Sequence, residues 1–270
     1  MGIMDSIFGN GAAQATATPA GLTREEVEAR LRDGVRTLAG AELAGADLEG
    51  AELEGVDLSG ARLRNARLRG ANLRGANLTG AQLCGTDLTG ANLQNAVLHN
   101  VNCLRTGALK PPVLDGADLT GADLTGAELS HASLKGTTLT GAVLADVGLG
   151  QADLTAAHAG GARFPGASLR HAKLDDATFS GADLAEADLT RARAHGANFS
   201  GASLVRANLT EAQLQGADLS GAVFRDAQLD DAILRGATLT GASFAGADLD
   251  GADVGGAEGG DFTGAHNLRR

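Results

Sequence analysis

The chain has 270 residues, a net charge of −11, and no Trp or Tyr. Its 22 basic and 33 acidic residues argue against direct nucleic-acid binding, which usually needs a basic face. The hydrophobic share of 43% is too high for a disordered chain, and no apolar run is long enough for a membrane span. Because two cysteines cannot build a disulfide scaffold, we expect free thiols and a cytoplasmic location.

Residues 1–22 are expected to form a flexible tail and linker. Their start lacks the basic residues of a secretory signal. Residues 1–6 (MGIMDS) fit the permissive myristoylation pattern, but no basic residues follow that would help anchoring. The apolar side chains at the start would share one face of a helix, so this segment is either a short docking peptide or a frayed terminus. They are Ile3, Met4, Ile7 and Phe8.

A short helix is predicted over residues 23–34. Thr23 and Glu26 have the spacing of a capping box, in which each side chain binds the backbone N–H of the other residue. Val27 and Leu31 lie one turn apart, and Gly34 is a typical end signal. We expect this helix to cover the first coil of the segment that follows.

A five-residue repeat dominates residues 35–258. Leu recurs at every fifth position from Leu38 to Leu98, thirteen times in all, and the spacing resumes for 28 more centres from Leu119 to Val254. Ala stands two residues before 36 of these 41 centres. Neither a helix nor a long strand has this period, whereas a short Ala-x-Leu strand followed by a corner fits it.

One glycine column indicates how many corners close a coil. Seven glycines recur without a break at a step of twenty residues, and steps of ten or fifteen mix this column with others that contain Asp, Gln and Ala. Four five-residue sides per coil, with a left-handed corner that demands glycine, explain the pattern. The column consists of Gly121, Gly141, Gly161, Gly181, Gly201, Gly221 and Gly241.

The repeat slips by one residue between its two blocks. We expect a one-residue bulge near residues 103–104, which would place Gly121 in one column with Gly80 and Asn100. Cys84 would then face outward and Cys103 inward, without a bond between them. Counting the irregular centres between the blocks gives about 11 coils of 20 residues. Residues 259–270 are expected to form a C-terminal cap or tail.

The repeat resembles that of the pentapeptide-repeat family, as in Ala46-Asp47-Leu48-Glu49-Gly50. The resemblance covers residues 36–258 and implies an all-β fold, a right-handed quadrilateral parallel β-helix (β-solenoid), here with a short N-terminal capping α-helix. Some members resemble duplex DNA in width and charge and bind type II topoisomerases in its place. The resemblance also raises the prospect of a homodimer through the C-terminal end.

Charge is distributed unevenly along the expected rod. Near the start, a step of twenty residues places Glu42 over Arg62 and Glu49 over Arg69, which predicts a ladder of exposed ion pairs of little energetic worth. Further ladder pairs are Asp47 with Arg67 and Glu54 with Arg74. Residues 207–262, in contrast, hold ten acids and two bases. The acidity is therefore concentrated toward the C-terminal end.

One side of the rod is less polar and is called the valine face below. We expect it to be a contact face for another chain or for an oligomer. It consists of two columns, Asp123, Val143, Arg163, Asp183, Ser203, Val223 and Ser243, and Thr125, Ala145, Pro165, Ala185, Val205, Arg225 and Ala245.

The sequence offers no site for catalysis, a cofactor or a metal. The regular corners build no groove that could bury a nucleophile, and the six histidines are too far apart for a shared ion. We therefore expect a non-catalytic scaffold or protein-binding module. The alternative is a DNA mimic that modulates or protects a bacterial type II topoisomerase, either DNA gyrase or topoisomerase IV. Candidate partner-binding residues are Asp226, Asp230, Asp231, Asp248, Asp250 and Asp253.

Overall fold

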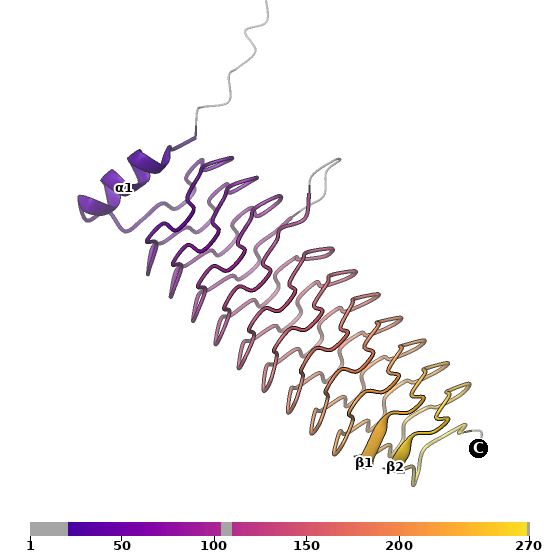
Figure 1. Cartoon of the computed structure of the whole chain (residues 1–270). Helices are drawn as coiled ribbons and strands as arrows, with labels where there is room; N and C mark the ends of the chain where they lie inside the picture. Colours follow the sequence, from indigo (N-terminus) through magenta and orange to yellow (C-terminus); the bar gives the residue numbers. More distant parts are fainter. Residues whose placement is uncertain (1–20, 104–109, 269–270) are drawn as a thin grey trace, which may run out of the picture.

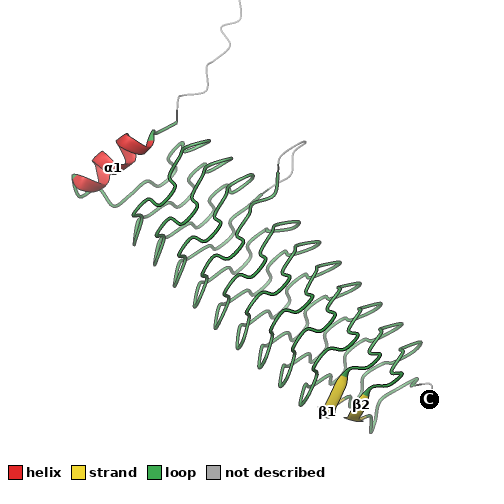
Figure 2. Cartoon of the chain, in the orientation of Figure 1, coloured by secondary structure: helices red, strands yellow, loops and turns green. Residues whose placement is uncertain are grey.

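The computed structural model describes residues 21–103 and 110–268, which form a long rod with helix α1 at one end (Figure 1). Three elements are long enough to carry labels: helix α1 spans Arg24–Arg32, strand β1 spans Thr238–Ser243 and strand β2 spans Glu258–Asp261. The rest of the rod is shown as loops and turns (Figure 2), because each straight segment makes only a single parallel bridge to its neighbour. The expected tail of residues 1–20 lies outside the described residues.

A step of twenty residues relates neighbouring coils, as the glycine column predicts. Asp57 bridges Asn77, and further along the rod Asp123 bridges Val143. Each bridge is made by two backbone bonds: the Leu58 N–H donates to the Asn77 carbonyl at 2.7 Å, and the Asn77 N–H donates to the Val56 carbonyl at 3.1 Å. Since the repeat has five residues, each coil has four sides.

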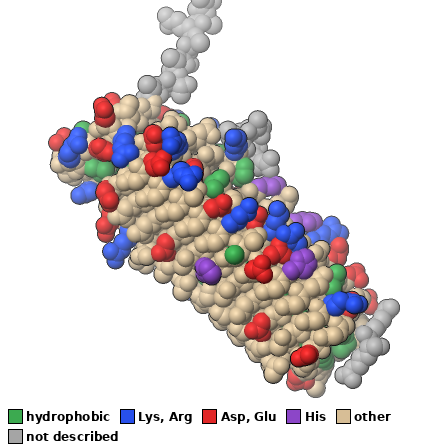
Figure 3. Space-filling view, in the orientation of Figure 1, with side chains coloured by type: hydrophobic (Ala, Val, Ile, Leu, Met, Phe, Trp, Pro, Cys, Tyr) green, Lys and Arg blue, Asp and Glu red, His purple; other side chains and the backbone are tan. Residues whose placement is uncertain are grey.

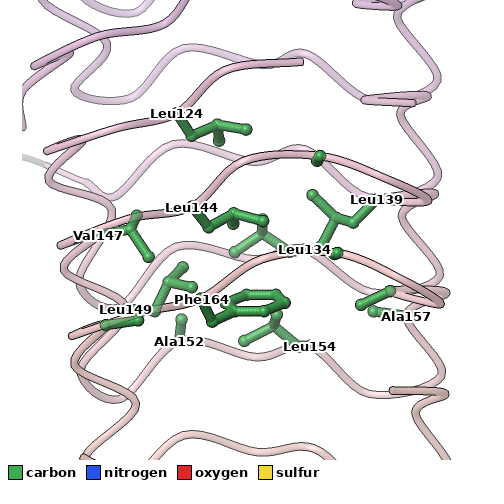
Figure 4. Close-up of a cluster of buried hydrophobic side chains, with 14 of the residues drawn as sticks. Leu124, Leu134, Leu139, Leu144, Val147, Leu149, Ala152, Leu154, Ala157 and Phe164 are labelled. Atoms are coloured by element: carbon green, nitrogen blue, oxygen red, sulfur yellow. The ribbon is translucent and has the colours of Figure 1, made fainter. Parts of the chain in front are cut away.

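The inside of the rod is filled by the repeat centres and by the alanines two residues before them. Leu124, Leu144 and Phe164 have no exposed surface, and Ala152 and Ala157 are equally buried (Figure 4). Side chains two residues apart on a short strand point to the same face, which is why these two positions of the repeat alone build the core. The outward positions are left free to vary.

Apart from the corner at Pro111–Pro112, each corner within the described residues contains a residue with left-handed backbone. The predicted glycine column has φ between 64° at Gly161 and 73° at Gly241. However, Asn95, His131 and Asp226 hold the same conformation at other corners. The expectation that one corner alone demands glycine is therefore wrong, because all four corners turn in the same way and tolerate other residues at some cost.

The predicted one-residue bulge near residues 103–104 is also wrong. Gln82 still bridges Asn102, twenty residues on, but Asp87 bridges Val113, twenty-six residues on. Six residues are therefore added to this coil, and Gly121 lies over Asn95 rather than over Asn100. Because insertions of one and of six residues shift a five-residue repeat by the same phase, the sequence period cannot distinguish them. Residues 104–109 lie outside the described residues.

The two cysteines form a disulfide rather than the expected free thiols. Cys103 lies one coil after Leu83 and thus beside Cys84, with the two Cα atoms 4.7 Å apart, a separation that a disulfide can span. Cys84 is also 3% exposed rather than outward-facing, since the chain at Lys110 passes next to it. The disulfide removes one reason for expecting a reducing compartment, so the cytoplasmic location stays a prediction.

The predicted helix is present as α1, and both bonds of its capping box form. The Thr23 N–H donates to Glu26 Oε2 at 2.8 Å, and the Glu26 N–H donates to Thr23 Oγ1 at 3.3 Å. Val27 on its inner face is fully buried. At the other end of the rod β1 pairs in parallel with β2, and the ring of Phe262 stacks on Phe244 at 4.6 Å.

Candidate protein-interaction surface

The N-terminal coils carry acids and bases that neutralise one another. Arg67 contacts both Asp47 at 3.1 Å and Glu49 at 2.7 Å. The other two predicted pairs that form are Arg62 with Glu42 at 2.9 Å and Arg74 with Glu54 at 3.8 Å. In Figure 3, blue and red side chains accordingly alternate near the α1 end of the rod.

One predicted pair of this ladder is replaced by another. Arg69 contacts Asp87 at 3.3 Å, eighteen residues along, instead of Glu49. Long side chains can reach diagonally into the neighbouring column, and Glu49 has a closer base in Arg67. Most of these side chains are about half exposed, and Asp87 and Glu42 remain 31% and 21% exposed, so each pair stabilises the fold by only about 0–1 kcal/mol.

The candidate acids near the C-terminal end gather on one side of the rod, which we call the acidic side. This side is centred on Leu229 and Leu249. Asp248 lies on its flat part, and Asp230 and Asp250 lie in the turns that follow Leu229 and Leu249. Asp226 and Asp231 are the left-handed residues at the two corners that bound it.

Asp253 lies apart from the other five candidates, on the next side of the rod. It bridges Ile233 in the backbone ladder, and its carboxylate contacts Arg235 at 3.2 Å. Hydrogen bonds from the Gly255 backbone N–H and from Arg235 hold the pKa of Asp253 below its ordinary value of 3.8. The charge of Asp253 is thus partly neutralised, which makes it the weakest of the six candidates for partner binding.

Bases are scarce around the acidic side. Within the described residues, three ion pairs involve residues 207–262: Arg191 with Glu211 at 2.7 Å, Arg225 with Asp226 at 3.9 Å and Arg235 with Asp253 at 3.2 Å. The Asp248 carboxylate accepts a hydrogen bond from the Asn267 amide at 2.8 Å, a neutral partner that leaves the charge in place. The acidic side therefore presents a negative field that the N-terminal coils lack.

Two corner carboxylates of the acidic side lie against glycines of the next coil. A Cβ atom at Gly246 would come within 2.3 Å of Asp226 Oδ1, and one at Gly251 within 2.1 Å of Asp231 Oδ1. Glycine at these corners therefore makes room for the acid one coil earlier. The sequence contains these Asp and Gly residues twenty positions apart, but only the register shows that each Asp lies against the Gly of the next coil.

Sequence reasoning missed a groove between α1 and the first coils. It has a volume of about 340 Å³, and its lining includes Val27, Leu31 and Ala51 together with Arg24 and Arg36. The amphipathic pattern of the helix indicated its buried face, but a groove beside the helix depends on how far α1 stands from the coil. No group of three or more His, Cys, Asp or Glu side chains in residues 21–103 and 110–268 is arranged to hold a metal ion.

The valine face is a continuous flat ladder, as the twenty-residue step predicts. Its outward residues bridge one another from Asp123 to Ser243 without an insertion. Val223 is 38% exposed, and among the described residues Val35 is the other large hydrophobic side chain that is exposed to this extent. Within residues 21–103 and 110–268, no helix is both long and apolar enough to cross a bilayer.

These features define a β-solenoid built from five-residue repeats. The sequence model of the family described as pentapeptide repeats matches the chain in eight copies, over residues 37–75, 76–106, 113–146, 149–185, 187–226 and 222–258. The chain therefore belongs to the pentapeptide-repeat family, whose members fold as right-handed β-helices.

Three solved structures illustrate the similarity. HetL, a pentapeptide repeat protein involved in heterocyst differentiation regulation in the cyanobacterium Nostoc sp. strain PCC 7120, is 31% identical over 90% of this chain and 96% of its own, with a TM-score of 0.43. QnrB1, a plasmid-mediated fluoroquinolone resistance protein, is 20% identical over 82% and 91%, with a TM-score of 0.40. A pentapeptide repeat protein of the Arabidopsis thaliana thylakoid lumen is 31% identical over 42% and 70%, with a TM-score of 0.23. No curated protein matches the sequence.

Proposed function

We propose that this protein is a non-catalytic scaffold or protein-binding module that acts in the cytoplasm. Its rod of about eleven coils, closed at one end by α1, presents a rigid acidic surface to a protein partner. The regular backbone ladder makes the surface rigid, and the near absence of bases around the acidic side makes it negative. Such a surface attracts and orients a basic patch on a partner.

The observation that carries this proposal is the excess of acidic over basic residues toward the C-terminal end. Residues 207–262 hold ten acids and two bases, a net charge of −8. At about 4.8 Å of rise per twenty-residue coil, this segment is about 13 Å long, so one net negative charge falls every ~1.7 Å. Residues 36–103 of the same rod hold seven acids and six bases.

This charge density favours a second, more specific candidate, a DNA mimic that binds a bacterial type II topoisomerase. Duplex DNA also carries one negative charge per about 1.7 Å of its axis. A basic surface that evolved to hold DNA would therefore meet a similar linear charge on the C-terminal coils. DNA gyrase and topoisomerase IV are the partners that this candidate predicts.

A comparison of three proteins tests the binding module. The first is the wild type, and the second carries Asp→Asn at the six candidate positions 226, 230, 231, 248, 250 and 253. The third is a matched control with the same change in net charge, in which the six acids at positions 42, 47, 49, 52, 54 and 57 become amides. Immobilised wild type and control should retain the same partner from cell extract, and the C-terminal variant should lose it. Equal retention by all three would contradict the proposal.

A supercoiling assay with purified gyrase, with and without a quinolone, separates the two candidates. A DNA mimic should change the rate of supercoiling or the sensitivity to the drug at micromolar protein, and the C-terminal variant should have no such effect. The absence of any effect by the wild type would exclude the DNA mimic while leaving the binding module in place.

A further inference from the structure

We propose that the valine face joins two copies of this chain side by side into an antiparallel homodimer. The two-fold axis lies in the plane of contact, between the coil of Arg163 and the coil of Asp183. This contact differs from the end-to-end homodimer expected through the C-terminal coils, and it leaves both rod ends free.

The first support is the surface composition of the valine face. Val143, Val205 and Pro165 are partly exposed, and Val223 is 38% exposed. These side chains stand on outward positions of the ladder, where the repeat elsewhere places Asp, Asn, Thr or Ser. A row of apolar side chains along one flat face gains free energy when a partner removes it from water.

The second support is the flatness of the face, which selects the shape of its partner. The bridges from Asp123 through Arg163 to Ser243 all step by twenty residues, so no loop rises from this part of the face. A flat sheet packs best against another flat sheet. A second copy of the same face has that shape by construction.

The third support is a pair of opposite charges on adjacent rungs of one column. Arg163 and Asp183 are neighbours in the ladder, yet within the described residues Arg163 makes no ion pair. The Asp183 carboxylate accepts a hydrogen bond from the Ala185 N–H at 3.1 Å. Two adjacent rungs of opposite charge are self-complementary when the column meets itself in the reverse direction.

The antiparallel arrangement then fixes every other contact. A two-fold axis in the plane and along the strands keeps each column opposite itself and reverses the order of its rungs. Arg163 meets the second copy's Asp183, and Asp183 meets the second copy's Arg163. By the same operation Val205 meets the second copy's Ala145, and Arg225 comes beside the second copy's Asp123. No pair of like charges is brought together among these positions.

The size of the face indicates a reversible dimer. Six rungs, from Asp123 to Val223, meet one another across this axis; at about 4.8 Å each they give a length of about 29 Å, and three extended residues give a width of about 10 Å. Such a face buries less than the about 800 Å² per partner that is usual in stable complexes. The dimer should therefore dissociate on dilution, with salt favouring the monomer because part of the attraction is electrostatic.

Sedimentation equilibrium over a range of protein concentrations tests the dimer. Arg163→Asp and Asp183→Arg each place two pairs of like charge in the contact and should weaken dimerisation by about tenfold or more. The double variant Arg163→Asp/Asp183→Arg restores both pairs and should dimerise like the wild type. Lys173→Asp, on another side of the rod, is the matched control and should leave dimerisation unchanged.

An equimolar mixture of the two single variants gives an independent readout. One variant then carries two acids and the other two bases at these rungs, so the mixture should form a heterodimer at concentrations where each variant alone is mostly monomeric. This result also shows that both variants are folded. The proposal is wrong if the wild type stays monomeric at millimolar concentration, or if it dimerises and the single variants dimerise equally well.

Discussion

The two ends of the rod share one backbone and differ in nearly every outward side chain. In residues 36–103 the centres are Leu or Cys, and acids such as Asp47 are neutralised by bases one coil on, such as Arg67. In residues 207–262 Phe replaces Leu at two centres, and the acids outnumber the bases by ten to two. Both ends keep the same register, because inward side chains and left-handed corners set it. The outward positions were thus free to become neutral at one end and acidic at the other.

The difference in the core is tested by Phe244→Ala, which should have the largest effect on stability. Phe244 is fully buried, and its ring stacks between Phe224 at 4.7 Å and Phe262 at 4.6 Å. Removal of this ring should lower the free energy of unfolding by about 3–5 kcal/mol. Leu58→Ala in the N-terminal coils should lower it by about 2–5 kcal/mol. Hydrogen exchange of the neighbouring backbone measures the effect locally, since coils of a solenoid open separately. If Phe244→Ala and Leu58→Ala each reduced the protection of their own coils by the same amount, the stacked rings would add nothing to stability.

The disulfide distinguishes the N-terminal coils in a second way. Cys84→Ser/Cys103→Ser, or reduction of the wild type, should lower the free energy of unfolding by about 2–4 kcal/mol, because the bond constrains the unfolded chain. Exchange should rise mainly around residues 82–103 and 110–118, and residues 207–262 should keep their protection. A uniform rise along the rod would contradict the separate behaviour of the two ends.

A glycine substitution tests whether a corner glycine of the acidic side makes room for the acid one coil earlier. Gly246→Ala puts a Cβ into left-handed backbone, at a cost of about 1–2 kcal/mol, and also displaces the Asp226 carboxylate. Gly181→Ala is the control with the same conformation and no atom within 4 Å of the new Cβ. Thermal unfolding should rank Gly246→Ala as the more damaging. Adding Asp226→Ala should remove the difference, and its persistence would refute the contact.

The ion pairs of the N-terminal coils should matter least. Arg67→Met removes the contacts to Asp47 and Glu49 and should change stability by about 0–1 kcal/mol, because all three side chains are about half exposed. The effect should shrink as salt is added. A loss of several kcal/mol in urea unfolding would mean that this pair does more than neutralise charge.

Acid should weaken the N-terminal coils around Asp57. Hydrogen bonds from the Ser59 backbone N–H and hydroxyl lower the pKa of Asp57 below its ordinary value of 3.8. The unfolded chain then binds the proton more tightly than the folded chain does. The contribution of Asp57 to the free energy of unfolding is therefore complete above the unfolded pKa and is lost as the pH falls through the folded pKa. Exchange measured from pH 6 to pH 3 should therefore show a loss of protection around Asp57.

Much of the fold could be predicted from the sequence, because a five-residue period and an unbroken glycine column leave few arrangements of the chain. The capping box at Thr23 likewise placed α1 to within a residue or two. The size of the insertion after Cys103 could not be predicted, because one and six residues leave the same phase. The disulfide depends on how closely the chain at Lys110 passes Cys84, and the diagonal pair of Arg69 with Asp87 depends on side-chain reach.

The candidate acids illustrate the same limit for function. Counting charges pointed to the C-terminal coils, but only the register shows that five of the six acids lie on one side and that Asp253 lies on the next, beside Arg235. The self-complementary order of Arg163 and Asp183 also depends on the register, since it requires knowing that the two residues are adjacent rungs of one column.

Mapping the footprint of a bound partner tests the central claim most directly. Hydrogen exchange of the full-length protein should be measured with and without the partner that wild type retains and the C-terminal Asp→Asn variant loses, or with gyrase if the supercoiling assay is positive. The account predicts protection over residues 226–253 and none over residues 42–74. Protection of the ion-paired N-terminal coils, with the acidic side unchanged, would contradict it.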